Sequence, residues 1–225
     1  MDALKPEIEN QAAESPSPAR PHKTRRRLTA LAAVVVLAAG GCLGYRNFYL
    51  FYDNFHTVVP GQVYRCDRPN PSRLAEWSRT YGIKTSLNLE GGDEADKWYL
   101  DNARAKRELG IMAVDIKLAT NRLPTADELH HIIRTIETAP RPLLINCRAG
   151  SERTGMASVI AAMAVGGQDY KTARGQLSAK YLHFYHGSTR AEGVADQYEE
   201  YCRANNLDTG GWPQFRRWAM DVYKP

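Results

Sequence analysis

The sequence predicts one α/β domain with a mostly parallel sheet of four to five strands flanked by helices, preceded by one transmembrane helix. Two patterns predict this class. Short β-type runs alternate with helical segments after residue 60, and an uncharged run of eighteen residues, 28–45, precedes them. We therefore divide the chain into a disordered cytoplasmic tail (1–27), a transmembrane signal anchor (28–46) and one domain (53–225).

The uncharged run is long enough to cross a bilayer. At about 1.5 Å per helical residue it extends roughly 27 Å, close to the hydrocarbon thickness. Arg25, Arg26 and Arg27 precede it and an aromatic segment follows it. Because positive flanks stay cytoplasmic, we expect a single-pass inner-membrane protein whose domain is periplasmic. Cleavage or lipidation of the leader stays open. Residues 1–24 contain four prolines and little apolar sequence, which indicates disorder.

The first half of the domain shows strands and helices with clear end signals. A strand is predicted over 62–66. Asn70 and Pro71 are typical of a helix N-cap and first turn, and Gly82 ends that helix. Then follow a strand over 83–89, a helix over 93–109 and a strand over 111–118.

The second half of the domain is mostly helical. Thr125 and Glu128 form a capping box, and Pro140 ends the helix that they begin. Residues 143–146 are a short apolar run typical of a central buried strand. The remaining helices are predicted over 154–165, which is almost wholly apolar and so buried, over 169–181, over 189–205 with a capping box at Thr189 and Glu192, and over 212–222.

Charge and cysteine content exclude several functions. The net charge of +5 comes without an aromatic-interleaved basic stripe, so we expect no nucleic-acid partner. Four cysteines without close spacing give neither a disulfide framework nor a four-cysteine zinc site. A Cys66–Cys202 disulfide and two buried free thiols stay equal alternatives. His183 and His186 have no suitable third ligand nearby, so we expect no metal and no cofactor.

The segment Cys147–Gly155 has the chemistry of a phosphate loop. It joins the apolar strand to the apolar helix, with Cys147 at its start and Arg153 six residues later. The backbone N–H groups of Arg148, Ala149, Gly150, Ser151 and Glu152 can curl around a phosphate at the helix N-terminus. The same positive field favours a thiolate, so Cys147 is the expected nucleophile. Arg153 suits bidentate contact to phosphoryl oxygens, and Thr154 can donate its hydroxyl to the leaving sulfur.

These residues carry a resemblance. CRAGSERTG resembles the signature loop of bacterial cysteine-dependent tyrosine/dual-specificity protein phosphatases, and Gly61–Pro69 with Gly82–Leu89 is similar to the start of their secreted members. The resemblance covers roughly residues 55–205. It implies a phosphatase fold, no metal and a cysteinyl-phosphate intermediate, with Cys147 as nucleophile, Arg153 as phosphate clamp and residues 148–152 as the backbone cradle.

One part of the family pattern is missing. Many members place an aspartate general acid after the strand that precedes the capping-box helix, but residues 116–126 contain no acid. Glu152 is the first candidate, because a neighbouring phosphoryl dianion would raise its pKa. Asp115 is the second and Asp127 the third. For each, an ion pair or a helix-end role is the competing interpretation.

The expected partner is a phosphorylated protein, with phosphotyrosine preferred and phosphoserine or phosphothreonine as alternatives. An inositol-phosphate or phosphoinositide phosphatase has the same loop but favours more basic residues in the cradle, whereas this loop adds only Arg148 and opposes it with Glu152. A non-catalytic phosphate-binding module needs no thiolate. A sulfur-transfer enzyme needs neither Arg153 nor Thr154.

Overall fold

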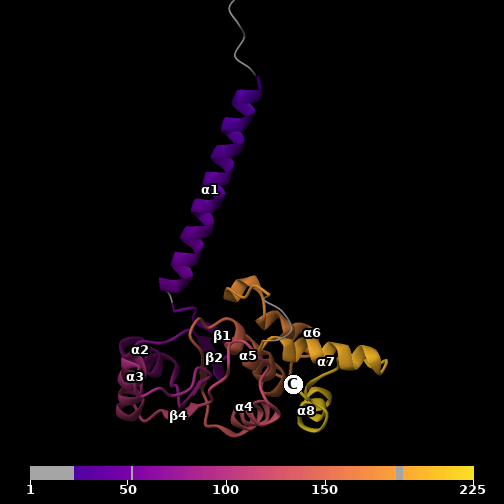
Figure 1. The fold of residues 1–225 in the computed structure, drawn as a ribbon. Helices are drawn as coiled ribbons and strands as arrows, with labels where there is room; N and C mark the ends of the chain where they lie inside the picture. Colours follow the sequence, from indigo (N-terminus) through magenta and orange to yellow (C-terminus); the bar gives the residue numbers. More distant parts are fainter. Residues whose placement is uncertain (1–22, 52, 186–189) are drawn as a thin grey trace, which may run out of the picture. The chain divides into compact units, whose positions relative to one another are not determined.

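The computed structural model describes residues 23–51, 53–185 and 190–225. The chain divides into two compact units, residues 1–45 and residues 46–225. Helix α1 (Lys23–Phe51; Figure 1) accounts for the described residues of the first unit. By length and apolar character, no helix of the described segments qualifies as a membrane crossing. The anchor over 28–46 therefore stays a prediction, and most of the tail predicted over 1–27 lies outside the described residues.

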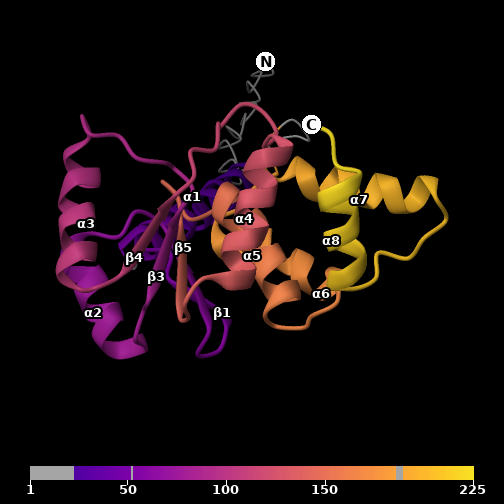
Figure 2. The same ribbon diagram turned by 90° about the horizontal axis from the view of Figure 1, so that it is seen from below.

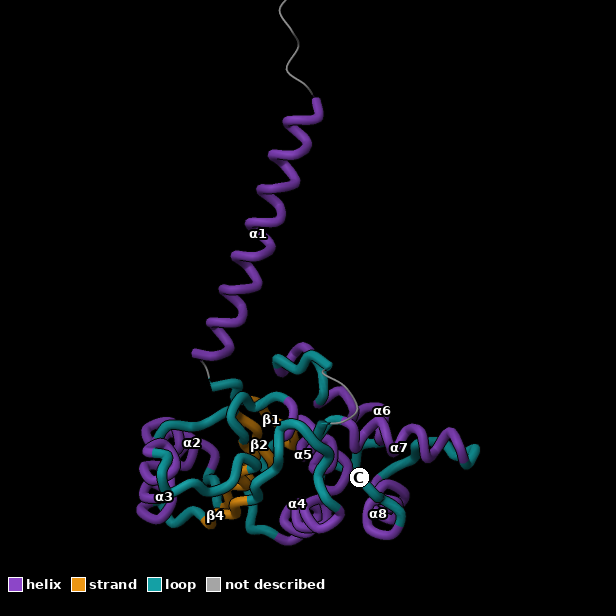
Figure 3. The backbone as a smooth tube through the Cα atoms, viewed as in Figure 1, coloured by secondary structure: helices purple, strands orange, loops and turns teal. Residues whose placement is uncertain are grey.

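A mostly parallel sheet forms the centre of the second unit (Figure 3). Its strand order is β1-β2-β5-β3-β4, with only β1 antiparallel to its neighbour. The central strand β5 pairs Asn146 with Cys66 on one side and with Asn88 on the other. The predicted α/β class is confirmed. The strands are β1 (His56–Val59), β2 (Val63–Cys66), β3 (Thr85–Asn88), β4 (Met112–Asp115) and β5 (Leu143–Asn146).

Helices cover both faces of the sheet (Figure 2). On one face, α2 (Pro71–Tyr81) and α3 (Lys97–Glu108) lie side by side, and Leu74 and Trp77 of α2 are buried beneath them. On the other face, the apolar α5 (Glu152–Ala164) is buried along most of its length within the larger core, with α4 (Ala126–Thr138) beside it. The α6 (Tyr170–Ala173), α7 (Gly193–Ala204) and α8 (Trp212–Asp221) helices complete this layer.

Local hydrogen bonds explain why two helices begin where the sequence predicts. The Asn70 side chain accepts from the backbone N–H of Arg73, and Gly82 ends α2 in the left-handed conformation. At α4, Thr125 and Glu128 make both bonds of the capping box. The bounds of both helices are thus determined by residues within one turn of their ends.

Other elements depend on distant contacts, and the predictions there are wrong in part. Strand β1 was not predicted. Helix α3 begins later than residue 93, because Asp93 forms a turn and Asp96 is the N-cap. The helix predicted over 169–181 stops at Ala173 and gives way to two 3-10 turns, since the Gln176 carbonyl oxygen accepts a hydrogen bond from Arg65 instead.

The remaining local predictions concern capping and cysteines. In the predicted second capping box, Thr189 lies outside the described residues, and Glu192 is the N-cap of α7 without a side-chain capping bond. Cys66 and Cys202 are buried free thiols in the two separate cores on opposite faces of the sheet. The structure thus favours free thiols over the alternative disulfide.

Candidate active site

The loop after β5 carries Cys147 and fits closely against the end of β2. Cys147 is 2% exposed. Gly150 has a φ of +64°, and a Cβ there would lie 2.6 Å from the Cys66 carbonyl oxygen and 2.7 Å from the Asp67 nitrogen. Because the contacted atoms are backbone, no side-chain movement can relieve this clash. Both the conformation and the space therefore require glycine at this position.

Two buried polar side chains hold the carbonyl groups of the loop. Arg65 Nη2 donates to the carbonyl oxygens of Gly150 at 2.7 Å and of Ser151 at 3.3 Å. Asn54 Nδ2 lies 3.1 Å from the carbonyl oxygens of Ala149 and of Gly150. In a trans peptide the N–H points opposite to the C=O. Carbonyl groups that are bound outside the loop therefore direct the following N–H groups to its inner side, as an anion-binding nest requires.

The Arg65 side chain lies in an environment that disfavours its charged form. The side chain is fully buried and has no carboxylate partner among the described residues; its guanidinium stacks 4.1 Å from the Tyr181 ring centroid. Burial lowers the pKa of Arg65 to about 10. Sequence analysis missed Arg65 and Asn54. An arginine inside a strand with Val63 and Cys66 was a usable signal for the first, whereas Asn54 gave none.

The first turn of α5 leaves its N–H groups available. Ser151 occupies the N-cap position, but its side chain makes no capping bond and donates instead to the Leu182 carbonyl oxygen at 3.0 Å. The first N–H groups of a helix have no intrahelical acceptor. The free N–H groups of α5 follow directly after the loop that starts at Cys147. The loop and the helix therefore present one continuous set of N–H hydrogen-bond donors.

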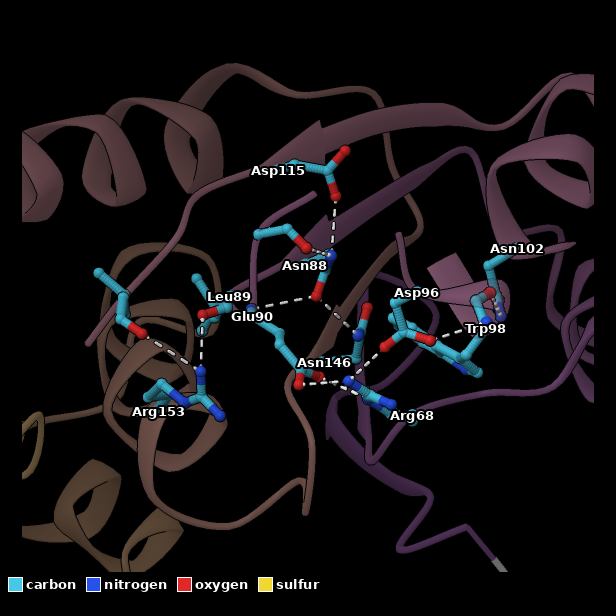
Figure 4. Close-up of polar contacts among 12 residues, drawn as sticks. Arg68, Asn88, Leu89, Glu90, Asp96, Trp98, Asn102, Asp115, Asn146 and Arg153 are labelled. Carbon is cyan, nitrogen blue, oxygen red and sulfur yellow. Dashed lines mark hydrogen bonds and ion pairs between the residues drawn. The ribbon is translucent and has the colours of Figure 1, made fainter. Parts of the chain in front are cut away.

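Arg153 lines a pocket beside this loop, and Figure 4 shows its backbone contacts. Its Nη1 lies 3.3 Å from the carbonyl oxygens of Leu89 and of Leu118, which follow β3 and β4. The side chain is 8% exposed. The pocket has a volume of about 380 Å³, and Arg148 and Lys117 also line it. The structure thus brings the two predicted loop arginines together in one pocket.

Thr154 is fully buried in the same turn of the helix. Its hydroxyl makes no hydrogen bond to any described residue, so the expected bond to the Cys147 sulfur is not formed in this state. A hydroxyl without another partner is free to turn toward the sulfur. Its role at the leaving sulfur stays a prediction.

Asp115 lies apart from the pocket. It is the last residue of β4, where Oδ1 accepts from Asn88 Nδ2 at 2.8 Å and Oδ2 from the Tyr99 hydroxyl at 3.1 Å. Asn146, the residue before Cys147, lies two strands away in the register, which is about 10 Å at normal strand spacing. The structure therefore gives Asp115 a place in a polar ladder rather than at the loop. Asp127 lies in the first turn of α4.

The acidic residues that line the pocket all contact neighbouring groups of the protein. Arg68 contacts Glu90 at 2.5 Å and Asp96 at 2.9 Å, and its guanidinium stacks 4.5 Å from the Trp98 ring centroid. Asp93 accepts the Ala95 N–H in its turn. Glu90 and Asp96 are thus held in ion pairs, and Asp93 in its turn.

Glu152 lies within the loop but not among the residues that line the pocket. Its carboxylate faces Arg190, with Oε2 3.6 Å from Nη1, and it interacts with Glu192. Burial first, and then the Glu192 charge, raise the pKa of Glu152, while Arg190 opposes them. The ion pair expected as the alternative to an acid role for Glu152 is thus present, and the pKa of Glu152 is raised as well.

Asp67 is an acidic residue that sequence analysis did not consider. It follows β2 directly, against Gly150, and its buried Oδ1 has no hydrogen-bond partner in the described part of the chain. Burial and the neighbouring Asp53 raise the pKa of Asp67 to about 7. The signal available from sequence was an acid directly after a buried strand.

The histidine pair gives no metal site in the described structure. His183 is buried, and His186 lies outside the described residues. No group of three described His, Cys, Asp or Glu side chains is arranged to hold a metal ion.

Comparison with solved structures finds distant similarity, and the structure with a TM-score above 0.5 shares the fold. The P. aeruginosa protein TpbA, in its complex with pTyr, is 20% identical, with 76% of this chain and 93% of that chain covered and a TM-score of 0.49. The catalytic core of the S. cerevisiae PP-IP phosphatase SIW14 is 18% identical, with 71% and 96% covered and a TM-score of 0.52. Comparison with curated proteins gives no match.

Comparison with protein families is decisive. The model described as "DSP-PTPase phosphatase fused to NAD+ Kinase" matches residues 63–197, more than half of the chain. The matched range begins with β2, ends within α7 and contains the whole Cys147–Arg153 loop. By this match and by its fold, the chain belongs to the DSP-PTPase family of cysteine phosphatases.

Proposed function

We propose that this protein hydrolyses phosphomonoesters of proteins, with phosphotyrosine preferred, through a cysteinyl-phosphate intermediate. One observation carries the proposal: the Cys147 loop, whose carbonyl groups are bound from outside by Arg65 and Asn54, contributes Arg148 and Arg153 to the lining of a pocket. Phosphoryl transfer to sulfur needs hydrogen-bond donors for the phosphate oxygens, a thiol as nucleophile and a cation that makes two contacts to the phosphoryl group.

The reaction then has two balanced steps. In the first, the Cys147 thiolate attacks phosphorus, the P–O ester bond breaks, and the leaving oxygen takes a proton from Glu152. In the second, water attacks the phosphocysteine, Glu152 takes the proton of that water, the S–P bond breaks, and phosphate and thiolate form. Arg153 and the loop N–H groups hold the equatorial oxygens in both steps, and Thr154 donates to the departing sulfur.

The test uses the full-length protein, purified in a mild detergent, with p-nitrophenyl phosphate. Turnover in the presence of a chelator, blocked by vanadate and abolished by Cys147→Ser, supports the proposal. An inert wild type that binds phosphate as well as Cys147→Ser does would make the loop a recognition module. Wild-type turnover that Cys147→Ser retains would refute the thiol mechanism.

A second candidate substrate class is an inositol phosphate. Arg148 and Lys117 line the pocket beside Arg153, and neither forms an ion pair within the described residues. They could hold a second phosphoryl group. Rates on a phosphotyrosine peptide and on inositol phosphates, measured at equal concentration, distinguish the two; a large preference for inositol phosphates would overturn the protein substrate.

We also propose that residues 28–46 anchor the protein in the inner membrane, with the phosphatase domain periplasmic. The uncharged run after Arg25–Arg27 supports this orientation. Fractionation of cells, followed by protease treatment of spheroplasts, tests it. Release of the domain into the soluble cytoplasmic fraction would contradict the proposal.

A further inference from the structure

The side chain of Asn88 joins three strand ends and one turn next to the phosphate loop (Figure 4). Asn88 is the last residue of β3 and is completely buried. Its Nδ2 donates to the Asp115 carboxylate at 2.8 Å and to the Gly91 carbonyl oxygen at 2.9 Å. Its Oδ1 accepts from the Glu90 backbone N–H at 3.1 Å and from Asn146 Nδ2 at 3.3 Å. One carboxamide thus connects β3, β4, β5 and the turn that follows β3.

The partners of this carboxamide fix its orientation. A carbonyl oxygen and an ionised carboxylate can only accept, so they require the NH2 group on their side. The Glu90 backbone N–H can only donate, so it requires the amide oxygen on the other side. Both N–H bonds of the Asn88 amide and both acceptor positions of its oxygen are therefore used. A buried polar network in which every member is satisfied makes its surroundings rigid.

The contacts of Asn88 lead to both groups that handle the phosphate. Asn146, the register partner of Asn88 in the sheet, directly precedes Cys147. On the other side, the turn after β3 begins with Leu89, whose carbonyl oxygen accepts from Arg153 Nη1 at 3.3 Å. The expected nucleophile and the expected phosphate clamp are therefore linked through a single side chain.

The sheet alone does not make this link. The Leu89 N–H donates to the Asn146 carbonyl oxygen at 2.8 Å, so backbone bonds hold the ends of β3 and β5 together. Beyond that bond the chain turns away from the sheet. Glu90 and Gly91, which line the pocket, are held to the strand ends by the Asn88 side chain.

We propose that Asn88 is a positioning residue for the reaction, which holds the Cys147 sulfur and the Arg153 guanidinium in the relative position that in-line attack on a bound phosphate needs. A misplacement of about 1 Å between reacting groups can slow a reaction by about 10²-fold. The loop carbonyl groups are held by Arg65 and Asn54 instead, so phosphate binding depends less on Asn88 than the chemical step does. This inference rests on the proposed function.

Asn88→Asp tests the proposal with almost no change of shape. The new carboxyl group keeps both acceptor bonds, but in its ionised form it cannot donate to Gly91 and it faces the Asp115 carboxylate. We expect kcat on p-nitrophenyl phosphate at pH 7 to fall about 10²-fold. KM should change less than about threefold, because the lost contacts act mainly in the transition state.

A double variant, Asn88→Asp with Asp115→Asn, tests the link by rescue. It exchanges the donor and the acceptor of the 2.8 Å bond and restores the original net charge. The new amide oxygen at position 115 can still accept from the Tyr99 hydroxyl, so only the bond to Gly91 stays unmade. We expect kcat to recover about tenfold relative to Asn88→Asp, which a residue with a merely structural role would not show.

The matched control is Asn102→Asp, the same substitution at an equally buried asparagine of α3. Its side chain donates to the Trp98 carbonyl oxygen within the helix. We expect a lower Tm and a kcat within about twofold of wild type. Circular dichroism confirms that each variant is folded.

Asp115→Ala supplies a second measurement at an exposed position, where a substitution is tolerated. It removes one acceptor of the Asn88 amide, and we expect kcat to fall about fivefold. The loss should be equal for phenyl phosphate and for 2,4-dinitrophenyl phosphate, because positioning affects attack on both esters. A proton donor would instead slow mainly phenyl phosphate, the ester with the poor leaving group.

Three results would overturn the proposal: a kcat in Asn88→Asp no lower than in Asn102→Asp, a loss that appears in KM alone, or a double variant no more active than Asn88→Asp. If a variant at position 88 fails to fold, Asp115→Ala decides alone, and an unchanged kcat or a loss confined to phenyl phosphate would contradict the role of Asn88. Failure of the proposed function looks different, because turnover would then survive Cys147→Ser.

Discussion

The Arg65 guanidinium donates to the Gly150 carbonyl oxygen at 2.7 Å, from the strand β2 that pairs with β5, which leads to Cys147. A buried cation is thus used to hold a backbone group rather than a carboxylate. The contact lies on the outer side of the phosphate loop, so it shapes the loop without touching a bound anion. Four predictions follow from contacts of this kind around the site.

Arg65→Lys should weaken anion binding more than it weakens the fold. Lysine keeps the charge but cannot reach Gly150, Ser151 and Gln176 at once, because it lacks the planar fork. Hydrogen bonds to charged groups contribute about 1.5–3 kcal/mol each, so we expect vanadate to bind roughly 10–100-fold more weakly. Inhibition constants measure this effect.

The matched control for Arg65→Lys is Arg73→Lys, at an ion pair on α2 outside the pocket. It should leave vanadate inhibition unchanged. Equal inhibition constants in wild type and Arg65→Lys, with both proteins folded by circular dichroism, would show that the loop holds its shape without Arg65.

Gly150→Ala should abolish activity and destabilise the protein. The new Cβ would lie within 2.7 Å of backbone atoms of Cys66 and Asp67, in addition to the left-handed strain of about 1–2 kcal/mol. Gly167→Ala is the control, since Gly167 has nearly the same φ, +65°, but no atom within 4 Å. We expect Gly167→Ala to lower Tm by a few degrees and to keep full activity. Similar losses in both variants would mean that strain, and not the contact with β2, limits position 150.

The contrast between these two glycines shows what sequence can and cannot predict. The caps at Asn70 and Thr125 follow from local sequence, and both are confirmed. The backbone contact that makes Gly150 irreplaceable comes from a strand more than eighty residues earlier, and no local pattern reports it.

The same distinction applies to the site as a whole. The positions of Cys147 and Arg153 follow from one contiguous motif after a buried strand, so they were predictable. Arg65, Asn54 and the Glu192 contact reach the loop through pairing of distant segments, and a sequence shows them only as unexplained polar residues in apolar surroundings. For the same reason the sequence does not show how far Asp115 lies from the loop: strand order puts β3 between it and β5.

Arg68→Gln should raise KM for anionic substrates with little change in kcat. Arg68 neutralises Glu90 and Asp96 at the pocket wall. Without it, two carboxylates would face an incoming phosphate, and we expect KM to rise about tenfold, more at low ionic strength than at high. The control is Arg122→Gln, which breaks an exposed ion pair with Glu128 outside this pocket. A fall in kcat at unchanged KM would assign Arg68 to the chemical step instead.

Asp67→Asn should stabilise the protein above neutral pH, and this effect should disappear as pH falls to about 4. The folded pKa of Asp67 is about 7, whereas an aspartate in an unfolded chain has a pKa of about 3.9. Between these values the folded state binds more protons than the unfolded state, so this group lowers the free energy of unfolding as pH rises from about 4 to about 7.

Above that window, the folded protein carries a largely buried carboxylate whose Oδ1 has no hydrogen-bond partner among the described residues. Asparagine removes that charge, so Tm at pH 8 should rise relative to wild type, and the difference between the two proteins should shrink as pH falls toward 4. Asp101→Asn serves as the control of opposite sign, because a hydrogen bond from Lys97 lowers the pKa of Asp101. A lower Tm for Asp67→Asn at pH 8 would show that the ionised Asp67 is stabilised in the folded protein.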